Sequence, residues 1–196
     1  KKSKNNTPCA VERFLPDLKA KIGDSQLDKN LGDLSLFLNW NQIFAGNGVD
    51  EKLAKGLCAG QIIGKQGLRK SCKLFMGLFL LAPRICYPLH QHDTLEFYYV
   101  VSGSVDIKHG RQKKSFRVLP GQFSITPNNQ VHSLTTSASP CLMSYIWIAG
   151  GGDLGSANWW WEEHTDGSWD RICWERQADT TWKATRRQKL SKKIIL

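Results

Sequence analysis

Two hydrophobic patterns divide the chain near residue 60. A helix before that point is indicated by four leucines at spacings of four and three: Leu27, Leu31, Leu34 and Leu38. A second, shorter helix is predicted between Asp50, a suitable N-cap, and Gly56, a suitable stop. We therefore expect residues 1–60 to form a helical extension that packs on the rest of the chain.

From about residue 61 the pattern changes to short strands. Segments rich in Val, Ile, Phe and Tyr alternate with Gly, Pro, Asn and Asp turns, which indicates an antiparallel sandwich or barrel over residues 61–150. The expected strands lie at Gln61–Ile63, Lys73–Leu81, Glu96–Val101, Ser104–Lys108, Ser115–Val118, Gln122–Thr126, His132–Thr136, Cys141–Ala149 and Asp170–Glu175. The polar stretch 108–114 is expected to form a hairpin tip.

Residues 151–182 are rich in tryptophan and are expected to contain a hairpin. Its strands should include Trp169–Trp174 and Thr181–Thr185. We expect Trp159, Trp160 and Trp161 to pack over the barrel rather than to form a lid. Residues 183–196 carry six basic side chains and no acidic one, and we expect a solvated basic tail.

Composition and charge place the chain among ordinary globular proteins. It has 196 residues, 41% of them hydrophobic and 22% charged, which suits one domain with extensions. The formal net charge of +10 would favour a nucleic-acid partner if it lay in a folded groove. Nine of those charges lie instead in residues 1–4 and 183–196. We therefore expect no nucleic-acid partner.

Cysteine usage and hydropathy give the expected compartment. The six cysteines form no CxxC pair, which excludes a zinc finger and favours free thiols in a reducing compartment. No run of about 18 apolar residues is present, so no transmembrane helix is expected. The first residues are basic and polar, unlike a signal peptide. We expect a cytoplasmic protein with no membrane partner.

Three histidines and a carboxylate form the main candidate site. His90 and His92 are two residues apart, so on a strand both imidazoles leave from one face. Glu96 follows on the same parity, and His132 comes from a later segment. Three imidazoles and one carboxylate make a half-cage for a divalent transition metal with positions open to a ligand. The alternative is a chance coincidence of strand histidines.

The spacing of these residues resembles the two motifs of the cupin superfamily. The first motif, HxHxxx(x)E, six residues and Gly, is similar to His90–Gly103, and the second, ending in P-x-G, two residues and His, to Gly121–His132. Arg84 and Asn129 stand where the motifs have Gly, and Asn tolerates a left-handed backbone. The resemblance implies a mainly β, double-stranded β-helix (jelly-roll) barrel holding one metal: Fe(II), Zn, Mn, Ni or Co.

Residues 56–150 resemble more narrowly the cupin-type dimethylsulfoniopropionate (DMSP) lyases, chiefly over 77–103 and 127–147. These enzymes remove a proton next to the carboxylate of this sulfonium zwitterion and expel dimethyl sulfide, leaving acrylate. The resemblance implies a carbon–sulfur lyase whose metal binds the substrate carboxylate. Tyr98, two residues after Glu96, matches the tyrosine that these lyases use as base.

Other aromatic residues are candidates for the pocket. Tyr87 and Tyr145 could take part in catalysis or bind the substrate, or be barrel tyrosines with satisfied hydroxyls. Trp147 could offer its ring to the sulfonium cation, although a strand Trp is more often core. Tyr99 should face the opposite side of the sheet. Two histidines are expected to face solvent, His109 in the hairpin tip and His164 in a polar loop.

Two other functions remain open at this stage. The same ligands could hold iron in a non-haem dioxygenase, which has no need of a phenolate base. A cupin could also bind a small ligand without turnover. Dimerisation through sheet edges or the N-terminal helices is possible for this superfamily, so a homodimer is a further hypothesis.

Overall fold

The computed structural model describes residues 9–44, 48–111, 113–150, 154, 157–177 and 182–190. Its helices are η1 (Ala10–Phe14), α1 (Leu15–Lys19), α2 (Gln26–Ser35) and α3 (Glu51–Gly56). Its strands are β1 (Asn41–Gln42), β2 (Leu57–Ile63), β3 (Leu74–Leu81), β4 (Cys86–Gln91), β5 (Thr94–Ser102), β6 (Val105–His109), β7 (Phe116–Val118), β8 (Phe123–Thr126), β9 (His132–Thr135), β10 (Cys141–Ala149), β11 (Ala157–Glu163), β12 (Trp169–Arg176) and β13 (Trp182–Leu190).

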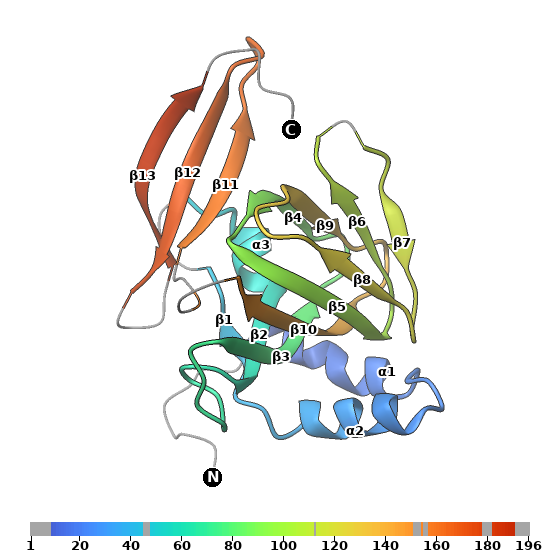
Figure 1. Cartoon of the computed structure of the whole chain (residues 1–196). Coiled ribbons are helices and arrows are strands. Elements are labelled where there is room, and N and C mark those ends of the chain that lie inside the picture. Colours follow the sequence, from blue (N-terminus) through green and yellow to red (C-terminus); the bar gives the residue numbers. More distant parts are fainter. Residues whose placement is uncertain are drawn as a thin grey trace.

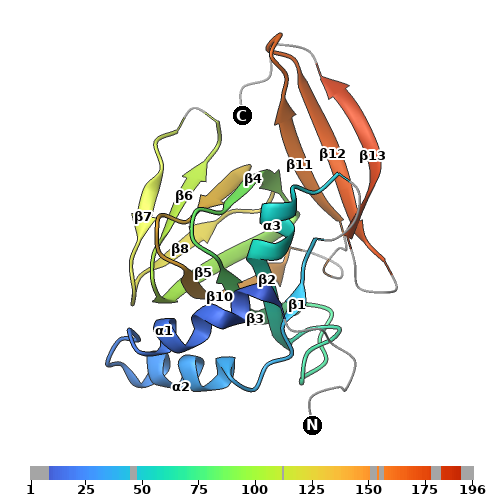
Figure 2. The same ribbon diagram turned by 180° about the vertical axis from the view of Figure 1, so that it is seen from behind.

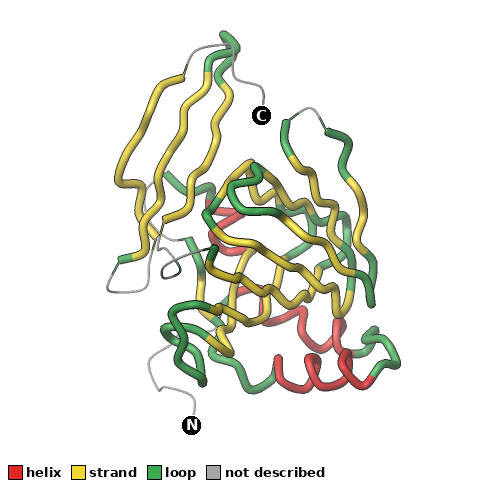
Figure 3. Tube along the Cα trace, viewed as in Figure 1, coloured by secondary structure: helices red, strands yellow, loops and turns green. Residues whose placement is uncertain are grey.

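The strands form two antiparallel sheets that face each other across the core (Figure 1). One sheet has the order β1-β2-β3-β10-β5-β8 and the other the order β13-β12-β11-β4-β9-β6-β7. Figure 3 shows that strands predominate over helices in the described chain. The prediction of a mainly β jelly-roll barrel with an N-terminal helical extension is thus confirmed.

The N-terminal helices lie against the outer face of the six-stranded sheet (Figure 2). The buried face of α2 differs from the predicted one: Leu31 is buried, but Leu27 is 52% exposed. Asp28 is buried instead, because its carboxylate accepts a hydrogen bond of 2.8 Å from the Tyr99 hydroxyl. Tyr99 therefore faces away from the barrel interior, as predicted. None of the described helices is long and apolar enough to cross a membrane.

The predicted helix after Asp50 is confirmed as α3, whose first turn is capped by the Asp50 carboxylate accepting from the Leu53 amide at 2.9 Å. The helical character does not extend to residue 60. Strand β1 and the start of β2 at Leu57 already belong to the six-stranded sheet. The six-stranded sheet therefore begins with β1 at Asn41, well before the expected start at residue 61, and β2 begins four residues before it.

The C-terminal segment extends the seven-stranded sheet. Strand β11 pairs with β4, placing Trp160 opposite His90, and β12 and β13 follow outward. Residues 183–190, expected in a solvated tail, instead form most of β13, while Thr181 and residues 191–196 lie outside the described residues. Arg187 on this strand bonds to Glu162 at 3.0 Å and to Asp170 at 2.5 Å. Basic residues on an edge strand also discourage pairing with other chains.

Two turns explain how the chain tolerates its departures from the cupin motifs. Arg84 and Asn129 have φ angles of 56° and 60°, and they are the non-glycine residues with positive φ among those described. These are the two positions where the motifs carry Gly. The turn at Asn129 closes with a hydrogen bond of 3.1 Å from the Gln130 amide to the Pro127 carbonyl. Positive φ at its third residue is the requirement of a type II turn.

This turn yields a stability prediction. Asn129→Val should lower the free energy of unfolding by roughly 1–2 kcal/mol, because a β-branched residue is strained at positive φ. Asn128→Val is the matched control, since both side-chain amides lie near Asp93 Oδ1, at 3.3 Å and 3.2 Å, and only Asn129 has positive φ. Urea unfolding followed by circular dichroism measures both. Equal losses in the two variants would contradict the backbone explanation.

Candidate active site

The four predicted metal ligands converge inside the barrel. His90 lies on β4 and His92 directly after it, Glu96 on β5, and His132 at the start of β9, opposite His90 in register. All four side chains are buried. The ligand atoms offered by the three histidines lie within 4.8 Å of one another. Glu96 Oε2 is 3.2 Å from His92 Nε2 and 3.1 Å from His132 Nε2.

Each imidazole is held in its orientation by a hydrogen bond between Nδ1 and a group outside the ligand cluster. Nδ1 of His90 bonds to the Pro88 carbonyl at 2.8 Å, and Nδ1 of His132 to the Gln130 carbonyl at 2.9 Å. A carbonyl accepts, so both Nδ1 atoms carry the proton and leave Nε2 as the lone-pair donor. Nδ1 of His92 bonds to the Thr94 hydroxyl at 2.5 Å. Such bonds are the usual support of metal-binding histidines.

The donor set fits a transition metal. Nε2 of His132 is buried and has no hydrogen-bond partner of good geometry among the described residues, although it lies close to Glu96. An unpaired buried polar atom is costly unless something else satisfies it. Three imidazole nitrogens and one carboxylate oxygen are suitable ligands for a divalent transition metal. The cluster could therefore hold one metal ion.

The charge state of the cluster suits metal binding. Burial by itself would raise the pKa of Glu96, but His92 and His132 outweigh that effect and hold the pKa well below its usual range. Burial, followed by the neighbouring His132 and His92, lowers the pKa of His90 well below its usual range. At neutral pH, Glu96 is thus an anionic carboxylate and His90 a neutral imidazole, the forms that bind metals.

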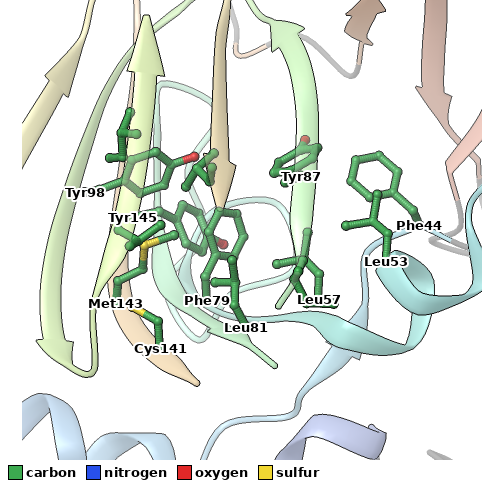
Figure 4. Close-up of a cluster of buried hydrophobic side chains, with 14 of the residues drawn as sticks. Phe44, Leu53, Leu57, Phe79, Leu81, Tyr87, Tyr98, Cys141, Met143 and Tyr145 are labelled. Carbon is green, nitrogen blue, oxygen red and sulfur yellow. The ribbon is translucent and has the colours of Figure 1, made fainter. Parts of the chain in front are cut away.

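Three buried tyrosines lie in the same barrel core as this cluster, and Figure 4 shows them among the hydrophobic side chains. Tyr98 on β5 and Tyr145 on β10 are opposite each other in register, whereas Tyr87 comes from β4 in the facing sheet. The Tyr87 ring stacks on His90, with ring centroids 3.8 Å apart. Burial, and then the charge of Glu96, raises the pKa of both Tyr87 and Tyr98 well above the usual range.

A cavity of about 330 Å³ adjoins the cluster. Its wall includes Tyr87, Tyr145 and Trp147, three of the residues predicted to contact a substrate. Tyr98 and the four candidate ligands are not part of that wall. The ligand cluster lies behind this wall, since Tyr87 stacks on His90 and Trp147 contacts Glu96. Tyr98 lies behind Phe79, another wall residue, with ring centroids 6.1 Å apart.

Trp147 was predicted only to offer its ring to a substrate cation, but it also contacts the candidate metal ligands. Its indole Nε1 donates to Glu96 Oε1, and its ring centroid lies 4.3 Å from that of His92. The indole therefore holds the oxygen of Glu96 that is turned away from the histidines. Trp147 both lines the cavity and positions a candidate ligand.

Two polar residues near the site were not foreseen. His109, expected in solvent, is half-buried on β6 opposite His132, with Nε2 3.2 Å from the Thr126 hydroxyl. That prediction is wrong, and the alternation with the buried residues Val105 and Ile107 was the available signal. Asn158 on β11 donates a hydrogen bond to the Tyr87 hydroxyl, and no sequence motif indicates this contact. His164 is 42% exposed, in line with its prediction.

Comparisons with known proteins indicate the family of the chain. The family model for dimethylsulfoniopropionate lyase matches residues 1–143. A curated relative from Cereibacter sphaeroides, named for dimethylsulfoniopropionate lyase DddL, is 30% identical over 101 residues, covering 50% of this chain and 41% of the relative. The chain thus matches less than half the length of that relative.

Solved structures share the fold. DMSP lyase DddQ from Ruegeria pomeroyi DSS-3 superposes with a TM-score of 0.65 and 17% identity, over 80% of this chain and 79% of that one. A structure described under the DMSP lyases RdDddP and RnDddQII gives a TM-score of 0.61 and 22% identity, over 76% and 78%. Because the family model covers well over half of its residues, this chain belongs to the dimethylsulfoniopropionate lyase family.

Proposed function

We propose that this chain is a metal-dependent lyase that cleaves DMSP by β-elimination into dimethyl sulfide and acrylate. The observation that carries the proposal is a buried cluster of three histidines and a glutamate behind a tyrosine-lined cavity, in a chain of this family. The substrate is a small zwitterion, and a cavity of about 330 Å³ has room for it.

His90, His92, Glu96 and His132 would hold the metal. A divalent transition metal bound there would act as a Lewis acid on the substrate carboxylate, and its charge would favour the phenolate form of Tyr98. Trp147 and Thr94 support this ligand set by bonding to Glu96 and His92. Both contacts come from the protein itself and keep the donors oriented.

Tyr98 is the proposed base. Its hydroxyl is buried, has no hydrogen-bond partner among the described residues, and leaves β5 on the same face as Glu96. As phenolate it takes the proton from the carbon next to the carboxylate. The electrons of that C–H bond form the new double bond of acrylate, and those of the C–S bond leave with dimethyl sulfide.

The cavity wall suits the cationic end of the substrate. Tyr87, Tyr145 and Trp147 present aromatic rings, which attract cations. Phe79 stacks on Tyr145 with centroids 4.4 Å apart and holds that ring in place. The carboxylate is then directed toward the ligand cluster and the sulfonium group toward the aromatic wall.

Product stoichiometry tests the proposal. The full chain, supplied with Fe(II), Mn, Zn, Ni or Co in turn, is incubated with DMSP while headspace dimethyl sulfide, acrylate and dissolved oxygen are measured together. We expect equal amounts of dimethyl sulfide and acrylate and no oxygen uptake. Oxygen consumption in step with substrate loss would favour the dioxygenase, and saturable binding without products a non-catalytic cupin.

A further inference from the structure

Strands β11 and β13 contribute residues to the cavity wall that lie beyond the family match. The family model ends at residue 143, yet Asn158 on β11 and Trp182 on β13 both line the cavity. Trp182 packs against Phe44, another wall residue, with ring centroids 5.8 Å apart. Two of the residues that line the cavity therefore come from strands that lie wholly beyond the family match.

Asn158 is tied to the candidate metal ligands through one tyrosine. Its side chain is 1% exposed, and its Nδ2 donates to the Tyr87 hydroxyl at 2.8 Å. The Tyr87 ring in turn lies flat on the His90 imidazole, with an angle of 17° between the planes. Because β11 and β4 pair with Trp160 opposite His90, the backbone holds Asn158 at the level of the ligands.

The carbonyl oxygen of the Asn158 side-chain amide has no such partner in the part of the chain that the structure describes. Oδ1 is buried and has no hydrogen-bond partner among the described residues, although the side chain borders the cavity. A buried carbonyl oxygen without a donor is expensive, so a ligand that satisfies it gains affinity. This oxygen carries partial negative charge and repels a carboxylate, whereas a cationic group with polarised methyl hydrogens complements it.

The aromatic part of the wall supports the same polarity. Among the described residues that line the cavity, the charged side chain is Lys65, which repels a cation, and no aspartate or glutamate is present. A cationic group in this cavity must therefore be recognised by neutral groups. Aromatic faces come from Tyr87, Phe44 and Trp182, all on the same side as Asn158. A neutral carbonyl among aromatic rings attracts a sulfonium or quaternary ammonium group more strongly than a neutral alkyl group of the same shape.

We propose that Asn158 is a specificity and positioning residue of this site: its oxygen recognises the cationic end of the substrate, and its nitrogen holds Tyr87 against His90. The proposal rests on the proposed function, because it assumes that the zwitterion occupies this cavity. On this proposal, Asn158 on β11 lets the site distinguish a short carboxylic acid with a cationic tail from one with a neutral tail.

Binding of two inert probes tests the recognition of charge without turnover. The probes are β-alanine betaine, a carboxylate with a trimethylammonium end, and 4,4-dimethylpentanoate, which has the same shape but a neutral tert-butyl end. Titration calorimetry on the full metal-loaded chain gives both dissociation constants. We expect the wild type to prefer the betaine. Asn158→Leu, which keeps the branched shape but removes both polar atoms, should lose about tenfold of that preference.

Asn158→Asp covers the case in which the leucine variant does not fold. It keeps a partner for the Tyr87 hydroxyl and makes the oxygen anionic, so the preference for the betaine should rise above that of the wild type. An unchanged preference in the folded variants, or no preference in the wild type, overturns the inference. Dimethyl sulfide release by the wild type is scored separately, so the lyase proposal can stand when this one fails.

A double-mutant cycle tests the positioning of Tyr87. Tyr87→Phe keeps the ring on His90 but removes the acceptor for Asn158 Nδ2. If the two side chains act as a unit, then kcat of the Tyr87→Phe, Asn158→Leu double variant should be about that of the weaker single variant, with bound metal unchanged. Independent, multiplying losses would reject the coupling, because a merely structural Asn158 would not depend on the Tyr87 hydroxyl.

Discussion

Tyr98→Phe is expected to lower kcat about 10²–10⁴-fold, the usual contribution of a positioned general base. The substitution removes one oxygen that has no hydrogen-bond partner among the described residues. The ring stays in the core beside Phe79, whose centroid is 6.1 Å away, so the fold and the bound metal should be retained. Headspace dimethyl sulfide gives the rate, and metal analysis of the same sample shows that the cluster is intact.

The neighbouring tyrosine provides the matched control. Tyr99 lies on the opposite face of β5 and donates to the buried carboxylate of Asp28. Tyr99→Phe should cost about 1–3 kcal/mol of stability, because the carboxylate loses a donor, yet leave kcat near that of the wild type. A Tyr98→Phe variant with wild-type kcat would transfer the role of base to Tyr87 or Tyr145, and the mechanism proposed here would be wrong.

His132→Ala should abolish metal retention. It removes one of four donors, the Nε2 that lacks a protein partner among the described residues. Loss of an outer hydrogen-bond partner alone costs about 10–100-fold in metal affinity, and loss of a ligand should cost at least as much. The metal-to-chain ratio after desalting, measured by plasma mass spectrometry, should fall to a small fraction of the wild-type value, together with dimethyl sulfide release.

His109 offers the comparison for that variant. It is a second histidine directly across from His132 on β6, is half-buried, and bonds to Thr126 rather than to a candidate ligand. His109→Ala should therefore keep the metal. Retention of metal by His132→Ala together with its loss from His109→Ala would place the binding site elsewhere in the barrel.

The proximity of three of the four ligands could be predicted because His90, His92 and Glu96 are close together in the sequence. His90 and His92 share a strand face through the two-residue period, and Glu96 follows after a short turn. The arrival of His132 beside His90 depends on the pairing of β4 with β9, which the residues alone do not reveal. Only the resemblance to the cupin motifs supplied that contact in advance.

The residues that finish the site could not be predicted, because tertiary pairing alone places them. Asn158 meets Tyr87 across 71 positions of sequence, and nothing in its surroundings marks it. Residues 183–190 of β13 were expected in a solvated tail because the segment 183–196 carries basic side chains and no acidic one, and only residues 181–185 were predicted in a strand. Its pairing partner is β12, and contacts such as Arg187 with Asp170 appear only once both strands are placed.

Metal dependence of dimethyl sulfide release tests the central claim most directly. The full chain is stripped with EDTA, desalted and reloaded separately with Fe(II), Mn, Zn, Ni or Co, and each form is given DMSP. The account predicts no release from the stripped chain, and restored release with equimolar acrylate from at least one reloaded form. Undiminished release from the stripped chain, or none from any reloaded form, would contradict it.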